Sequence, residues 1–173
     1  TGHCMASIKA GEDALGITPT EQTVAMRKYH LHLETMDSHL LHCYFLVAPD
    51  AFGVPSVLPL IETHKDVVLR ALRMKKQLSD MCDIIAGRHT HPITCCIGGY
   101  TKLPSKKELE KIREILKVHE EDVVKTAETF KAVTLPAFER ETEYVALTHP
   151  DENAFLDGDL TPTDIKKNGK PMD

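Results

Sequence analysis

The chain lacks several features that would fix its location or its chemistry. Its longest apolar runs are far shorter than the roughly 20 residues that a membrane-spanning helix needs. Its five cysteines form no C-x-x-C pair, and their odd number favours a reducing compartment, which we take to be the cytoplasm, over a disulfide framework. The net charge of −5 argues against nucleic acid or an anionic membrane surface as the main partner.

The sequence also lacks an initiator methionine and a signal-peptide pattern, and its last residues, 168–173, have turn composition. We therefore interpret it as a piece of a longer protein. Its 173 residues, 42% of them hydrophobic, are enough for one core. We expect residues 1–140 to form that core and residues 141–173 to form an appendage.

Sustained helical periodicity predicts a mainly α fold. A first helix is expected to end at Gly16, and three long helices are expected near residues 19–48, 62–86 and 106–134. Because the connections between them are short, we expect an antiparallel bundle. Two short strands, at residues 143–147 and 154–156, predict a small β appendage at the C-terminal end.

Capping residues predict where the long helices begin and end. Thr18 and Glu21 form a capping box that should start the first long helix, which Pro49 should end. Ser105 and Glu108 form a second box that should start the third. Four basic residues on the second long helix are most simply a solvated face: Arg70, Arg73, Lys75 and Lys76.

One stripe of the first long helix combines histidine, methionine and cysteine. At 100° per residue it contains His32, Met36, His39, Cys43 and Leu46, with His42 beside it. His39 and His42 could share a metal with Cys43. We favour the alternative, a buried polar seam whose histidines bond to neighbouring helices, because no fourth ligand lies at a familiar zinc spacing.

The loop of residues 87–104 is the densest group of reactive side chains. It holds two histidines, two adjacent cysteines, two prolines and three glycines between helical patterns. Pro92 should push His91 toward an extended conformation. Gly98 and Gly99 permit a positive φ or a close approach to another surface. Such a loop is a usual place for function, and the alternative is a connector whose histidines cap helix ends.

Three ordered blocks of sequence carry a resemblance to a known family. They are Thr1-Gly2-His3-Cys4-Met5-Ala6-Ser7, then Ser38-His39-Leu40-Leu41-His42 running into Ala48-Pro49-Asp50, then Gly87-Arg88-His89-Thr90-His91-Pro92 leading to Gly98-Gly99. Together they resemble the large subunit of nickel–iron (NiFe) hydrogenases, in the style of the soluble, cofactor-coupled branch. The resemblance spans residue 1 to about 160 and implies the helical-bundle core of that subunit.

In that family the metals are held by four cysteines in two C-x-x-C motifs, one near each end of the subunit. His3 matches the final histidine of the first motif, so the resemblance places its second cysteine before Thr1 and the second motif beyond Asp173. The nickel–iron centre would then belong to the full-length parent, with no metal ligand in this segment. Five cysteines match no ligand position: Cys4, Cys43, Cys82, Cys95 and Cys96.

The resemblance implies supporting roles for three residues. His3 resembles the family histidine that hydrogen-bonds near a bridging cysteine. Ser38 stands where many uptake enzymes carry an aspartate above the metals. His91 resembles the histidine that faces the small subunit and its nearest iron–sulfur cluster.

The implied function is that of a hydrogenase large-subunit segment. Its parent would oxidise H₂ or reduce protons, and electrons would pass through an iron–sulfur small subunit to further electron-transfer subunits. Two alternatives are a metal-free, hydrogenase-like subunit of a complex-I-type membrane complex and a purely structural helical module. We expect the isolated segment to be inactive and to self-associate, because helices missing from it would leave apolar faces bare.

Overall fold

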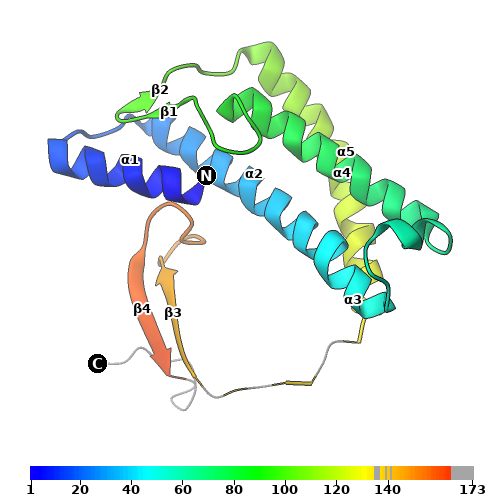
Figure 1. The fold of residues 1–173 in the computed structure, drawn as a ribbon. Helices are drawn as coiled ribbons and strands as arrows, with labels where there is room; N and C mark the ends of the chain where they lie inside the picture. The colour runs from blue at the N-terminus through cyan, green and yellow to red at the C-terminus, as the bar shows by residue number, and fades with distance from the viewer. Residues whose placement is uncertain (135–136, 139, 141, 165–173) are drawn as a thin grey trace. The chain divides into compact units, whose positions relative to one another are not determined.

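The computed structural model describes residues 1–134, 137–138, 140 and 142–164. Contacts within the chain separate two compact units, Thr1–Thr134 and Leu135–Asp173. The first unit holds all the helices and a very short hairpin, and the second holds one longer hairpin (Figure 1). The predicted class, mainly α with a small β appendage, is confirmed. The division expected at residue 140 stays a prediction.

The first unit begins with two helices, α1 (Gly2–Leu15) and α2 (Glu21–Leu41). Helix α1 ends at Gly16 in the left-handed conformation, as predicted. Helix α2 begins later than expected, because the hydroxyl of Thr20 and not that of Thr18 accepts the amide hydrogen of Thr23, at 3.2 Å. The expected capping box of Thr18 is therefore wrong.

We predicted that the first long helix ends at Pro49, and this prediction is wrong. Helix α2 continues through a π-helical segment, η1 (His42–Val47), into α3 (Ala48–Phe52), which ends at Gly53. A proline lacks the amide hydrogen and crowds the carbonyl of the preceding turn. A widened π turn immediately before Pro49 accommodates both effects, since such bulges relax the regular hydrogen-bond ladder.

The remaining helices are η2 (Leu58–Ile61), α4 (Lys65–Ala86) and α5 (Lys106–Lys131). Gly87 ends α4 as predicted. The predicted capping box at the start of α5 is confirmed, because the Ser105 amide donates to Glu108 Oε2 at 2.7 Å and Ser105 Oγ accepts the Glu108 amide hydrogen at 3.3 Å. No helix among the described residues is both long and apolar enough to cross a membrane.

Helices α2 and α4 lie side by side in antiparallel directions, and α5 runs back along α4 (Figure 1). The predicted antiparallel bundle is thus confirmed. The core between the helices is formed by Leu33, Leu40, Tyr44, Ala71, Met74, Leu78, Met81, Cys82, Ile85 and Ile112. A smaller cluster under η2 contains Ala48, Val57, Leu60 and Val68.

The second unit is a hairpin of β3 (Glu143–Thr148) and β4 (Asp159–Asp164). The first strand agrees with the prediction, but a strand at residues 154–156 is wrong. Those residues lie in the connection, where the Phe155 amide donates to the Asn153 carbonyl at 2.8 Å. Leu147 of β3 pairs with Leu160 of β4 instead. The second strand therefore begins at Asp159, after this connection.

Candidate functional site

His3 and Ser38, the first two predicted site residues, lie on neighbouring helices. His3 is exposed in the first turn of α1, and Ser38 is exposed on α2. The amino nitrogen of Thr1 is 2.8 Å from Glu34 Oε1. Since Glu34 lies one helical turn before Ser38 on the same side of α2, the start of α1 lies beside the part of α2 that carries Ser38.

His91 is exposed in the connection between α4 and α5. The prediction that its backbone is extended is wrong. Its φ of 57° is the only positive value of any non-glycine residue that the structure describes. The amides of Ile93 and Thr94 donate to the Ala86 carbonyl, at 2.9 and 3.3 Å, and Thr94 Oγ1 donates to the Ile85 carbonyl at 2.8 Å. The loop therefore folds back over the end of α4, and the left-handed conformation, which histidine adopts more readily than most residues, gives the sharp return.

The second half of this loop is a hairpin that sequence reasoning missed, β1 (Cys95–Cys96) with β2 (Gly99–Tyr100). Gly98 lies in its turn with a φ of 79°, which favours glycine. The local geometry therefore accounts for Gly98. A role of the two glycines in the approach of a partner surface stays a prediction.

A buried ion pair that the sequence did not reveal holds this hairpin. Arg27 of α2 donates to both carboxylate oxygens of Glu12 in α1, at 2.8 and 2.6 Å. Arg27 also donates to the Cys96 carbonyl at 3.2 Å, and the Gly98 amide donates to Glu12 Oε1 at 2.7 Å. The hydrogen bond from Arg27 lowers the pKa of Glu12, against the opposing effect of burial, so the carboxylate stays ionised at neutral pH.

His30 and Cys95 form a second contact between α2 and the hairpin, with 3.5 Å between His30 Nδ1 and Cys95 Sγ. Burial lowers the pKa of His30 to about 4 and raises the pKa of the Cys95 thiol. At neutral pH both groups are therefore uncharged. A protonated thiol is a weak nucleophile and a weak metal ligand, so this pair is not an activated cysteine.

The histidine stripe of α2 is not the buried seam that we expected. His32, His39 and His42 are exposed, because α2 turns its other face, with Leu33 and Leu40, into the core. A pocket of about 190 Å³ opens between α2, η1, α4 and α5 and is lined by Met36, His39, Leu40, Cys43, Met74, His119, Val123 and Thr126.

The metal site considered for this stripe is not formed either. Within residues 1–134, 137–138, 140 and 142–164, no three or more His, Cys, Asp or Glu side chains are grouped so that they could hold a metal ion. The pKa of the Cys43 thiol, a possible ligand in the pocket, is raised by burial. The pocket is thus an apolar recess with a few polar groups at its wall.

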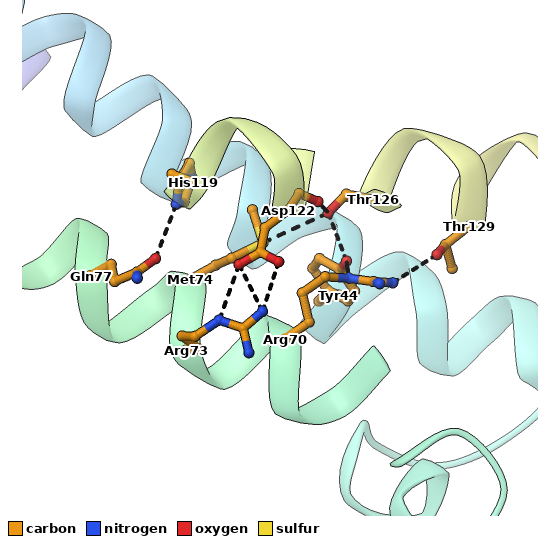
Figure 2. A network of polar contacts seen from close by, with 9 residues as sticks. All are labelled: Tyr44, Arg70, Arg73, Met74, Gln77, His119, Asp122, Thr126 and Thr129. Carbon is orange, nitrogen blue, oxygen red and sulfur yellow. Dashed lines mark hydrogen bonds and ion pairs between the residues drawn. The ribbon is translucent and has the colours of Figure 1, made fainter. Parts of the chain in front are cut away.

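The basic residues of α4 do not form a simple solvated face. Figure 2 shows Arg73 in a two-pronged contact with the buried Asp122 of α5, with distances of 2.7 to 3.1 Å. Arg70 is itself buried, and Lys75 pairs with Asp37 at 2.6 Å. The expected solvated face is wrong, because three of its four members join α4 to its neighbours.

The contacts of Arg70 continue into a network whose donors can be assigned by counting hydrogens (Figure 2). The single hydroxyl hydrogen of Thr126 goes to the Asp122 carbonyl at 2.6 Å, so Tyr44 must donate to Thr126 Oγ1, at 2.8 Å. Arg70 Nε in turn donates to the Tyr44 hydroxyl at 3.1 Å. This one-way chain of hydrogen bonds ties η1, α4 and α5 together.

Comparison with known proteins gives several relatives, although no family model matches the chain. Sulfhydrogenase 2 subunit alpha of Pyrococcus furiosus is 38% identical over 125 residues, which cover 72% of this chain and 29% of that protein. Sulfhydrogenase 1 subunit alpha of the same organism is 35% identical over 115 residues, covering 66% and 27%. The periplasmic NiFeSe hydrogenase large subunit of Desulfomicrobium baculatum is 24% identical over 166 residues, covering 80% and 32%.

A solved structure shows the same fold. The chain superposes on an NAD⁺-reducing NiFe hydrogenase in the H₂-reduced state with a TM-score of 0.71 and 20% identity, over 98% of this chain and 41% of that one. The chain spans less than a third of the length of the curated relatives described above.

Proposed function

We propose that this chain, which is similar to the large subunits of nickel–iron hydrogenases, is an internal segment of such a subunit. The parent enzyme would oxidise H₂ or reduce protons and pass electrons through an iron–sulfur small subunit. The observation that carries the proposal is the 38% identity over 125 residues to a hydrogenase alpha subunit. The similarity of the fold over 98% of the chain supports the proposal at the level of architecture.

The described residues do not fit a nickel–iron centre by themselves. They offer no group of three or more possible ligands. Burial raises the pKa of the Cys82 thiol to about 12 and also raises that of Cys95, whereas the metals of such a centre bind thiolates. The segment's proposed contribution is therefore to shape and support a centre whose ligands other parts of the parent supply.

Three exposed residues carry the proposed support. His3 would lie next to the cysteine pair that binds the metals and would hydrogen-bond there. Ser38 would lie above the metals, where its hydroxyl can donate and accept a hydrogen bond but, unlike an aspartate, carries no charge at neutral pH. His91 would face the nearest iron–sulfur cluster of the small subunit, where a hydrogen bond can tune the cluster's potential.

The proposed setting follows from the same reasoning. The partners would be the iron–sulfur small subunit and further electron-transfer subunits of the cofactor-coupled branch. We place the parent in the cytoplasm, because the five cysteines of the chain are free thiols and an odd number of thiols favours a reducing compartment.

The first test is the gene that encodes the parent. If the proposal is right, the encoded protein has a C-x-x-C motif that ends two residues before Thr1 and a second C-x-x-C motif after Asp173. A parent without these cysteines would have no ligands for the metals, and the proposal would fail.

The second test compares three histidine variants in the full-length parent with its small subunit. We expect His91→Ala to slow electron transfer to the acceptor with the nickel content unchanged, and His3→Ala to change the nickel signal in electron paramagnetic resonance. His89→Ala is the matched control, since His89 is exposed in the same loop and contacts Asp83 at 3.2 Å. A His91→Ala enzyme that loses nickel, beside an unaffected His3→Ala enzyme, would reverse the roles and refute the assignment.

A further inference from the structure

We propose that Glu12 and Arg27 are positioning residues that hold the loop of residues 87–104 in the shape in which it meets the small subunit. The inference rests on the proposed function, because it concerns the loop that carries His91. The pair would act through the backbone of the hairpin and would contact neither the metals nor H₂.

The pair binds the turn of the hairpin through hydrogen bonds to its backbone, and we call this arrangement the grip. Glu12 is 5% exposed and Arg27 is 2% exposed, and their two hydrogen bonds join α1 to α2. The same Arg27 nitrogen that binds Glu12 Oε1 also binds the Cys96 carbonyl, and the same Glu12 oxygen accepts the Gly98 amide. One carbonyl and one amide of the turn are thus held by two oppositely charged atoms that lie 2.6 Å apart.

The hairpin needs contacts with the neighbouring helices because its own strand pairing is short. Its two strands contain two residues each, and a two-stranded hairpin of any length is marginal in water. A further contact comes from α1, where the Ile97 side chain lies 2.8 Å from the position that a Cβ on Gly11 would occupy. Two adjacent residues of α1 therefore contact the turn: Gly11 leaves room for the Ile97 side chain, and Glu12 accepts the Gly98 amide hydrogen.

The pair also joins the three elements that carry the proposed site. Helix α1 contains His3, α2 contains Ser38, and the gripped loop contains His91. Loss of the grip would let the loop move relative to α1 while α2 and α4, which pack extensively on each other, remain together. The consequence expected in the enzyme is weaker binding of the small subunit, with the metal centre intact.

A charge swap separates the grip from a simple ion pair between helices. The double variant Glu12→Arg with Arg27→Glu restores opposite charges between α1 and α2. It then points a cation at the Gly98 amide and an anion at the Cys96 carbonyl, so the backbone contacts cannot form. An ion pair that only joins the helices would be rescued by the swap, whereas the grip would not.

The first readout is amide hydrogen exchange in this chain. In the swapped variant we expect the Gly98 amide to exchange about tenfold faster, as the loss of one hydrogen bond implies, while the amide of the buried Met81 in α4 exchanges at the wild-type rate. A wild-type rate at Gly98 would overturn the proposal. If the swapped variant does not fold, Glu12→Gln decides, because the acceptor of the Gly98 amide then loses its charge, and a hydrogen bond to a charged acceptor is about twice as strong as one to a neutral acceptor. A wild-type Gly98 rate in that variant would also overturn the proposal.

The second readout is the dissociation constant for the small subunit, measured with the full-length parent. We expect the swapped variant to bind the small subunit about tenfold more weakly and to retain its nickel. Faster exchange at Gly98 with unchanged small-subunit binding would refute the link to the partner. If the wild-type parent itself holds no nickel or binds no such subunit, the proposed function fails, and the exchange result still shows whether the grip exists.

Discussion

The hydroxyl of Tyr44 offers a sharp test of the network between η1, α4 and α5. Tyr44 is fully buried, and its ring meets Phe130 edge-on with 5.4 Å between ring centroids. Replacement by phenylalanine keeps that ring contact. It removes only the oxygen that accepts from Arg70 Nε at 3.1 Å and donates to Thr126 Oγ1 at 2.8 Å.

The size of the effect follows from what is left behind. Arg70 keeps its bond to Thr129 Oγ1 at 2.9 Å, and Thr126 keeps its bond to the Asp122 carbonyl. Only the buried Nε of a charged group loses its partner, and a hydrogen bond to a charged group contributes about 1.5–3 kcal/mol. We expect Tyr44→Phe to lower the free energy of unfolding by about 2 kcal/mol. For a chain of this size that corresponds to a decrease in Tm of about 4–8 °C.

The matched control is Tyr29→Phe. The Tyr29 hydroxyl is also buried, but it has no hydrogen-bond partner among the described residues, and burial raises its pKa. Removal of an unsatisfied hydroxyl should change the free energy of unfolding by less than about 0.5 kcal/mol or stabilise the fold. Urea unfolding followed by circular dichroism, at concentrations where sedimentation shows a monomer, compares the two. Equal losses in both variants would mean that the network does not stabilise the bundle.

Three further predictions concern pH, backbone conformation and association. Because the pKa of His30 is about 4 in the fold against 6.5 when unfolded, its contribution of about 3 kcal/mol is fully present above pH 6.5 and decreases as the pH falls toward 4; His30→Gln should remove that part of a stability–pH curve measured by urea unfolding. Gly87→Ala should lower Tm more than Gly16→Ala, since both have a positive φ but only a Cβ at Gly87 would lie 2.7 Å from Ile93. The isolated chain should form oligomers at high concentration, through apolar side chains such as the 54%-exposed Leu46; a strictly monomeric species in sedimentation would contradict this.

The parts of the fold that the sequence predicted correctly depend on neighbours in the chain. The helix ends at Gly16 and Gly87 and the capping box at Ser105 are set by residues within one turn, so a local pattern is enough. The predicted start of α2 was wrong because Thr18 and Thr20 are both plausible caps. The Thr20 hydroxyl is the one that accepts the amide hydrogen of Thr23. The passage through Pro49 was missed because a π turn has no clear sequence pattern.

The contacts that hold the candidate site together could not be predicted from local pattern. Glu12 and Arg27 are 15 residues apart, and Tyr44 and Thr126 are 82 residues apart, so nothing in either neighbourhood marks the pairing. Arg70 looked solvated because basic residues usually are, and only its buried partners show otherwise. The positions of His3, Ser38 and His91 came from family resemblance, and their proposed roles depend on surfaces outside this chain.

Burial and pairing hold four titratable groups of the chain in one protonation state near neutral pH. His30 and His119 are held neutral by burial, which lowers the pKa of each. The pKa of Cys82 is raised to about 12, and the ionised Glu12 is fixed by Arg27. The charges of these four groups therefore stay constant near neutral pH. If the proposed function is right, proton exchange in the parent enzyme uses exposed side chains of this segment or groups that other parts of that protein supply.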